Sequence, residues 1–404
     1  MMFRSLVFRL EKPLPDEVKL LMEDFRLAVN NAIRCGLQSR VTSRNSLTRL
    51  VYRDFRKEHP YMYSQHLVSA FEVAASALKN HRRRLRSNIP AKIPYIRRLF
   101  MKAENQAYKL DRKNGILDLP IRAGFHIQIK LLLSNYHRKY LDDESLSFGS
   151  LILLPDRVII TLRKYSLTPY APESILSLDT NERSIDGVLA MRSGIERIIK
   201  TEYPEIAAIQ ETHHRRRSRI QKKKAYDRRT VTKLCRKEGK REHHRVEYRL
   251  HQTANTVLSF AEENRSLIVL EDLTGIKPKK GKAFNRRISI WPRRKLQEII
   301  EYKAAWQGIS IIKVNPINSS RRCPACGKIQ QSRKGTEFKC ECGWHIDRHI
   351  NASINLLKTA APEWAAGGLR FGPSASQHDV VMVLCGRKAA RSKPNEMSGV
   401  RAIV

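Results

Sequence analysis

The sequence predicts a multidomain protein that joins an α+β part to an α/β part. Three observations support this. A strand near the N-terminus is followed by a long helical region and more strands, two later apolar strands each end in an acid, and four cysteines form two close pairs near the C-terminal end. At 404 residues the chain is long enough for two or three domains with cores of their own.

The N-terminal part changes from a strand pattern to a helical one and back. Residues 3–10 repeat apolar side chains with the period of a strand, and helical spacing then persists over roughly residues 11–88. Short strand patterns return at residues 116–120, 124–131, 150–154 and 157–162. We therefore expect residues 1–10 and 89–170 to form one small β-barrel into which the helical region is inserted.

The C-terminal part opens with an apolar strand that ends in Asp179, and Asp186-Gly187 is typical of a hairpin turn leading into a second strand. Residues 213–249 hold sixteen Lys or Arg against four acids, with a weak helical period that predicts a long basic helix or helix pair. Another buried-looking strand ends in Glu271, and a helix, a strand, the cysteines and a closing helix follow. Residues 361–404 show no period and predict a disordered tail.

The charge of the chain points to a polyanionic partner. Lys and Arg number 77 against 39 Asp and Glu, a net charge of +38. A single basic run is usually a solvated face, but an excess sustained through most of the chain predicts nucleic acid as the partner. No apolar run approaches the ~20 residues of a membrane-spanning helix, and the N-terminus does not read as a secretory signal, so we expect no membrane partner and a cytoplasmic location.

The four clustered cysteines predict a metal site. Two close pairs separated by a short hydrophilic loop can place four thiolates on one ion, for which zinc is the usual occupant; they are Cys323, Cys326, Cys340 and Cys342. We therefore predict a zinc ribbon over residues 321–345. The second pair has a one-residue spacer where two residues are usual, so the count of four cysteines alone does not settle whether zinc binds. Cys35, Cys235 and Cys385 are scattered and suit a reducing compartment.

Three acids stand at the ends of predicted elements: Asp179, Glu271 and Asp347. Carboxylates gathered from separate elements can hold two Mg²⁺ ions, which activate water and stabilise the leaving oxygen in phosphodiester hydrolysis. Each acid alone has a simple structural explanation, as a turn residue, a strand-end surface residue or a helix cap. Their joint order with the basic helices and the cysteines favours a nuclease site.

Several motifs resemble those of the TnpB family of transposon-encoded, RNA-guided nucleases, relatives of the type V CRISPR effectors. They include Ser177-Leu-Asp179-Thr-Asn, Ile268-Val-Leu-Glu271-Asp-Leu-Thr-Gly, Ser319-Ser-Arg-Arg-Cys323-Pro-Ala-Cys326-Gly and Asp347-Arg-His349-Ile-Asn351-Ala. The match covers about residues 174–357. The resemblance implies a wedge β-barrel with a helical recognition insertion, and a RuvC-like RNase H-fold domain over residues 171–320 and 346–360 that carries the zinc ribbon.

The resemblance also implies an activity. Members of this family cleave double-stranded target DNA with Mg²⁺ beside a short flanking motif, and a guide RNA from the transposon end selects the target by base pairing. The usual closing motif is Asp-Arg-Asp, but here it reads Asp347-Arg348-His349. Residues two apart on a helix face nearly opposite sides, so only one of positions 347 and 349 can face a metal. We predict Asp347.

Two alternatives stay open. His349 favours an RNA-guided DNA-binding protein with weak or no cleavage, and the charge alone would suit a general nucleic-acid-binding protein with a zinc module. Candidate phosphate contacts are Arg215, Arg216, Arg217, Lys222, Lys223, Arg286, Arg287, Arg293 and Arg294. Four histidines of the basic stretch are expected to face solvent or phosphate: His213, His214, His243 and His244.

Overall fold

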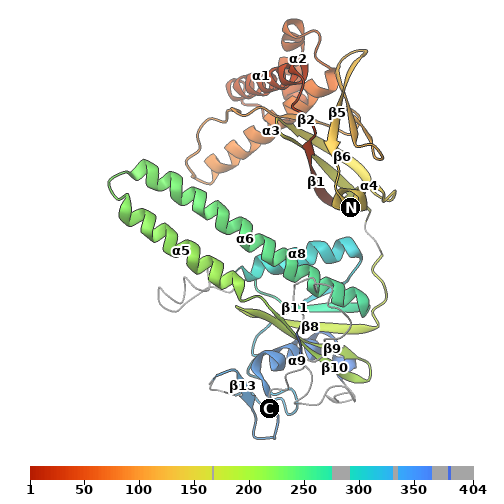
Figure 1. The fold of residues 1–404 in the computed structure, drawn as a ribbon, viewed down its shortest axis with the longest axis vertical. Coiled ribbons are helices and arrows are strands. Elements are labelled where there is room, and N and C mark those ends of the chain that lie inside the picture. Colours follow the sequence, from red (N-terminus) through yellow and green to blue (C-terminus); the bar gives the residue numbers. More distant parts are fainter. Residues whose placement is uncertain (166–167, 275–291, 331–334, 366–380, 384–404) are drawn as a thin grey trace. The chain divides into compact units, whose positions relative to one another are not determined.

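The computed structural model describes residues 1–165, 168–274, 292–330, 335–365 and 381–383. The chain divides into two compact units, Met1–Tyr165 and Ser166–Val404 (Figure 1). Both contain helices and strands, so the mixed α and β character predicted from the sequence is confirmed.

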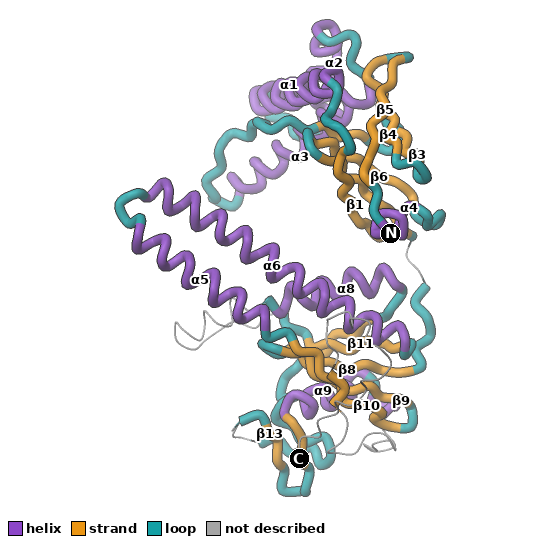
Figure 2. The backbone as a smooth tube through the Cα atoms, viewed as in Figure 1, coloured by secondary structure: helices purple, strands orange, loops and turns teal. Residues whose placement is uncertain are grey.

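A seven-stranded antiparallel sheet forms the framework of the N-terminal unit. Its strands are β1 (Met2–Leu10), β2 (Met101–Ala103), β3 (Lys109–Asp111), β4 (Ile116–Arg122), β5 (Phe125–Leu132), β6 (Ser147–Leu154) and β7 (Arg157–Lys164). They follow the order β2-β6-β7-β1-β5-β4-β3 and curl into a half-barrel, so the predicted barrel is present only as a half-closed sheet (Figure 2). Leu6 and Phe8 of β1 are buried whereas Phe3 and Val7 are exposed, so the strand shows the predicted alternation.

Three helices lie between β1 and β2 along the chain, inside the range predicted to be helical. They are α1 (Asp16–Gln38), α2 (Arg44–Glu58) and α3 (Ser64–Arg86). Phe25 of α1 and Phe71 of α3 are fully buried, as expected where helices bury apolar stripes. The short helix α4 (Asn135–Leu141) was not predicted, because its seven residues are too few for the helical period to stand out.

The C-terminal unit is built on a mixed six-stranded sheet. Its strands are β8 (Ser174–Thr180), β9 (Ser184–Met191), β10 (Gly194–Glu202), β11 (Ser266–Glu271), β12 (Ile311–Val314) and β15 (Val381–Val383), in the order β12-β11-β8-β9-β10-β15. β8 and β11 are parallel, so their acid-bearing ends lie at the same edge. Within residues 361–404, predicted to be a disordered tail, the structure has β15 and a short helix at residues 362–365; most of the tail lies outside the described residues.

Helices cover both faces of this sheet (Figure 1). α5 (Glu205–Lys223) and α6 (Arg228–Glu263) form the predicted helix pair, and α8 (Arg293–Gln307), α9 (Arg348–Ala360) and α10 (Pro362–Ala365) follow. Leu176 and Leu178 pack with α6 and α8, whereas Ile175 and Val269 pack with α9 and the cysteine loop. The alternation of side chains along a strand therefore places α9 and the cysteine loop on one face.

The turn between β8 and β9 does not lie where the sequence suggested. The backbone N–H of Asn181 donates to Ser184 O at 2.8 Å, so the chain reverses before β9, and the hairpin predicted at Asp186-Gly187 is wrong. Gly187 instead lies inside β9, where a Cβ would be only 2.3 Å from Ser177 O. Glycine is needed here because the backbone of β8 comes too close for a side chain.

Replacing Gly187 with Ala should destabilise the C-terminal unit by roughly 1–3 kcal/mol, because the added methyl group overlaps the backbone of β8. Gly239→Ala is the control, since a Cβ there meets nothing within 4 Å and Ala favours the helix by up to about 1 kcal/mol. Urea unfolding followed by circular dichroism measures both. Similar midpoints for the two variants would contradict the close approach.

Candidate functional site

Two acids meet at the sheet edge where β8 and β11 end. Asp179 and Glu271 directly follow Leu178 and Leu270, which are partners in the parallel pairing, and each is at most 9% exposed. Glu271 Oε1 accepts a hydrogen bond from the backbone N–H of Thr180 at 3.2 Å. Burial and then the charge of Asp179 raise the pKa of Glu271 to about 8. Two carboxyl groups so placed favour a bound proton or a bound cation.

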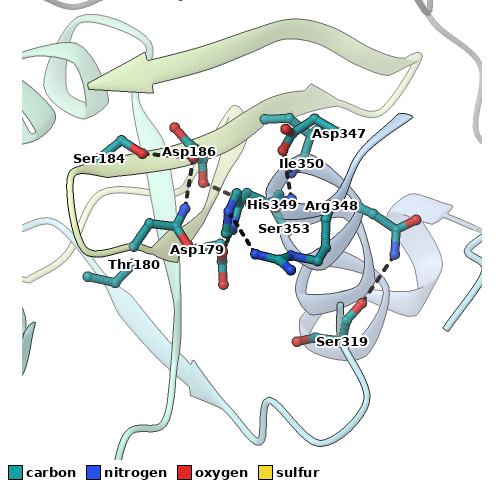
Figure 3. A network of polar contacts seen from close by, with 12 residues as sticks. Asp179, Thr180, Ser184, Asp186, Ser319, Asp347, Arg348, His349, Ile350 and Ser353 are labelled. Atoms are coloured by element: carbon teal, nitrogen blue, oxygen red, sulfur yellow. Dashed lines mark hydrogen bonds and ion pairs between the residues drawn. The ribbon is translucent and has the colours of Figure 1, made fainter. Parts of the chain in front are cut away.

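His349, and not Asp347, is the residue of the closing helix that reaches this pair. His349 Nδ1 lies 3.0 Å from Asp179 Oδ2 (Figure 3). Asp347 caps α9: its Oδ1 accepts the backbone N–H of His349 at 2.7 Å and that of Ile350 at 3.4 Å, and the residue is exposed. The structure thus brings Asp179 and Glu271 together, and gives Asp347 the capping role noted as its simple structural explanation.

A third acid of this region was missed from the sequence. Asp186 lies opposite Asp179 in the antiparallel pairing of β8 and β9 and is 4% exposed. Its Oδ2 accepts hydrogen bonds from Asn181 Nδ2 at 2.7 Å and Ser184 Oγ at 2.9 Å (Figure 3). Burial raises its pKa to about 6. An acid inside an otherwise apolar strand was the available signal, but the following glycine made it resemble a turn.

A cavity of about 580 Å³ opens beside this acid. Asp186, Asp347, His349 and Lys200 contribute to its lining. Asp347 therefore lines the same space as Asp186 and His349. Arg348 Nη2 lies 3.4 Å from His349 Nε2, which adds positive charge at this point.

The ligand types decide which cation fits the sheet edge. Mg²⁺ prefers oxygen ligands, whereas imidazole suits zinc, manganese and other transition metals. Asp179 and Glu271 offer oxygens, but His349 offers nitrogen at the position nearest to Asp179. Two carboxylates therefore fit Mg²⁺, and the third position does not.

The four cysteines do come together. Their sulfur atoms all lie within 4.8 Å of one another, and in the described part of the chain no other set of three or more metal-ligating groups does so. Cys323 Sγ is 3.5 Å from Cys342 Sγ, and Cys326 Sγ is 3.5 Å from Cys340 Sγ. The backbone N–H of Cys342 lowers the pKa of Cys340 to about 7. The set fits a tetrahedral zinc ion, and the one-residue spacer does not prevent it.

The strands β13 (Glu337–Lys339) and β14 (His345–Asp347) pair antiparallel on either side of the second cysteine pair. Cys340 N donates to Trp344 O at 2.9 Å, which closes the loop that carries both cysteines. Because β14 leads directly into the cap of α9, the cysteine loop and the closing helix are continuous.

Several predicted nucleic-acid contacts already have partners. Arg215 pairs with Glu211, Arg216 with Glu238 and Arg217 with Glu242. Lys222 and Lys223 are exposed at the end of α5 and have no ion-pair partner among the residues that the structure describes. Arg294 Nη2 donates to Leu273 O at 3.0 Å, and the charge of Arg293 acts on Glu271. Arg286 and Arg287 lie outside the described residues.

His213 corrects another expectation. It is 1% exposed, and its Nδ1 lies 2.8 Å from Glu238 Oε1, so it faces neither solvent nor phosphate. The partner comes from the neighbouring helix of the α5–α6 pair. Spacing along one helix could not reveal a contact made across two.

Comparisons with known proteins give two family matches and several similar proteins. The family described as Cas12f1-like, TNB domain, matches residues 294–356, and an uncharacterized family named after MJ0013 matches residues 21–117. TnpB-like protein MJ0751 of Methanocaldococcus jannaschii is 33% identical over 57% of this chain and 86% of its own length. The CRISPR-associated endodeoxyribonuclease Cas12f2 of a Micrarchaeota archaeon is 32% identical over 28% of this chain and 24% of its own length.

Solved structures support the fold. A Cas12f1 chain from a complex with sgRNA and target DNA aligns with 88% of this chain and 98% of its own at a TM-score of 0.54 and 15% identity. A likeness at this identity concerns the fold alone. No helix in the described ranges is long and apolar enough to cross a membrane.

The purified protein should hold one zinc ion per chain, because four sulfur atoms are already gathered within 4.8 Å. Cys326→Ser and Cys340→Ser should each lose most of this zinc, as measured by elemental analysis after dialysis. Cys35→Ser and Cys235→Ser, far from the cluster in sequence, should keep it. Full zinc retention in the first two variants would contradict the site.

The stability of the metal-free protein should depend on Glu271. Its pKa rises from 4.5 to about 8 in the folded state, so the folded protein holds a proton that the unfolded chain releases between these values. Stability should fall as the pH rises from about 4.5 to about 8 and then level off. Glu271→Gln should remove most of this slope and be more stable at pH 8 by on the order of 2 kcal/mol.

Urea unfolding in chelator at a series of pH values measures this slope. Glu298→Gln, which changes an exposed carboxyl group on α8, is the matched control and should keep the slope of the unsubstituted protein. Parallel curves for Glu271→Gln and the unsubstituted protein would show that Glu271 is not the titrating group.

Proposed function

The chain belongs to the family of TnpB-like proteins, and on this basis we propose that it recognises double-stranded DNA through a guide RNA and cleaves it at a centre built on Asp179 and Glu271. The pairing of these two buried acids at one sheet edge is the observation that carries the proposal. A relative named as a CRISPR-associated endodeoxyribonuclease supports it.

In this proposal residues 171–320 and 346–360 form a RuvC-like nuclease domain with a zinc ribbon at residues 321–345. Residues 1–10 and 89–170 form a wedge-type domain that carries the recognition helices of residues 11–88, and the chain acts in the cytoplasm. The guide comes from the transposon end, and the protein reads a short flanking motif and the backbone while base pairing reads the sequence. The net charge of +38 suits a protein that holds both strands of a heteroduplex.

The acid pair would hold Mg²⁺, which when bound activates water and stabilises the leaving oxygen of a phosphodiester. The chain's own residues prepare the pair for this. The Thr180 backbone N–H fixes one oxygen of Glu271, and Gln297 Nε2 donates to the Glu271 carbonyl at 3.1 Å. Because its pKa is about 8, Glu271 must lose its proton at neutral pH when a cation binds.

The exposed Lys and Arg side chains would bind the phosphates of RNA and DNA. Lys222 and Lys223 have no acidic partner among the described residues, so they can neutralise phosphate without breaking an ion pair. Arg216 and Arg217 would first have to leave Glu238 and Glu242. We therefore assign the end of α5 a larger share of binding than its middle.

A second candidate is guided DNA binding without cleavage, and His349 favours it. The imidazole contacts Asp179 at the position where the family motif has an acid, so the centre has one carboxylate fewer and a competing partner for Asp179. Both changes lower the affinity for Mg²⁺. Recognition of DNA would be unaffected, since it depends on other surfaces.

The test combines the protein with transposon-end RNA, target plasmid and Mg²⁺. Asp179→Ala should abolish cleavage, and His349→Asp should increase it by about tenfold or more, because a third oxygen ligand replaces the imidazole. Asp272→Asn is the matched control at the same sheet edge; its carboxylate accepts from Thr274 N, and cleavage should not change.

Guide-dependent DNA binding, measured by gel shift, separates the candidates. Tight binding with an intact plasmid, and cleavage that appears only in His349→Asp, would establish the second candidate. Binding that does not depend on the guide would contradict both.

A further inference from the structure

The closing helix α9 lies between the cysteine cluster and the acid pair. Its first turn carries His349, which contacts Asp179. Its middle contacts the backbone next to the cysteines, and the same stretch is bonded to the sheet. A single rigid helix of 13 residues therefore joins the two sites.

The cysteine cluster has two halves, the first at residues 319–326 and the second at residues 340–344. Asn351 of this helix contacts both halves. Its Nδ2 donates to Ser319 O at 3.3 Å and to Arg322 O at 2.9 Å, in the segment that leads into Cys323. Its Oδ1 accepts from Trp344 Nε1 at 3.2 Å, just beyond Cys342. The residue is 0% exposed, so no water can replace a lost partner.

Farther along α9 the side-chain hydrogen bonds reach only the first half, whereas Arg348 at its start bonds to Gly335 and Thr336 in the loop between the cysteine pairs. Asn355 Nδ2 donates to Ser319 O at 2.7 Å and Arg322 O at 2.8 Å, and Lys358 Nζ donates to Pro324 O, all in the first half. Among these ties between α9 and the cluster, the amide of Asn351 is the one shared by both halves.

The other side of the helix is fixed to the sheet near the acids. Ser353 Oγ donates to Asp186 O at 2.8 Å, and Ser177 Oγ donates to Ser353 O at 2.7 Å. Ser177 is two residues from Asp179 on β8. The bonds of Asn351 and Ser353 thus fix one helix against the cluster and against the strands that carry the acids.

We propose that Asn351 is a positioning residue through which a zinc-filled cysteine cluster holds the first turn of α9, and with it His349, against Asp179. Four thiolates on one zinc ion would fix the two cysteine pairs relative to each other, and this would keep partners on both halves within reach of one amide. Loss of zinc lets the halves separate, Asn351 loses a partner, and the first turn opens. The proposal rests on zinc binding and on the proposed role of Asp179, but its test needs neither guide nor DNA.

Hydrogen exchange of the full chain, read by mass spectrometry, tests this. The amides of the first turn are protected by defined bonds, since Arg348 N donates to Thr336 O and His349 N to Asp347 Oδ1. Removing zinc should speed exchange in peptides that cover residues 346–352 by about tenfold. Trp344→Phe, which keeps the buried ring but removes the donor to Asn351, should give this fast exchange with zinc still bound.

Asn351→Asp tests the same bridge from the helix side, since it keeps Oδ1 and loses the amide donors. It should also keep bound zinc while its first turn exchanges fast. Lys358→Met, which removes a tie to the first half only, is the matched control and should keep the slow, zinc-dependent exchange.

Three results would overturn the proposal. They are a chain that binds no zinc, an unsubstituted protein whose first turn exchanges equally with and without zinc, and a Trp344→Phe variant that keeps the full zinc response. The first result would leave guided cleavage untouched, and a protein without cleavage could still show the coupling, so the two proposals fail separately.

Discussion

The parallel pairing of β8 with β11 is the constraint on which the C-terminal unit depends. It carries Asp179 and Glu271 to one edge, out of water, although Thr180 and Glu271, whose side chain it binds, are 91 positions apart in the sequence. Burial, and then repulsion by the charge of Asp179, raise the pKa of Glu271 there. Apolar clusters on both faces of the sheet hold these two strands in place despite the unfavourable burial of the two acids.

The acid-ended strands and the cysteine cluster could be predicted because their signals are local. An apolar run that ends in an acid, or two close cysteine pairs, needs no knowledge of distant residues. What failed depended on contacts between elements. Gly187 resembles a turn residue in the sequence, but a Cβ there would lie 2.3 Å from the backbone of β8. His213 pairs with an acid on a different helix.

The choice between Asp347 and His349 shows most clearly what could not be predicted from the sequence. The spacing argument allowed only one of them to face a metal. It did not indicate which, because a residue just before a helix can turn its carboxylate back onto the free N–H groups of the first turn. Asp347 does this, and the side chain two positions later is the one that reaches Asp179.

His349 changes the chemistry of the edge without changing its framework. Ser177, Asn351 and Ser353 are all 0% exposed and hydrogen-bonded, so α9 is held in place independently of the side chain at position 349. The positive charge that would hold RNA and DNA is spread over 77 Lys and Arg, and does not depend on that side chain either. Under the proposed function, guided recognition and cleavage are therefore separable, and the imidazole beside Asp179 bears on cleavage alone.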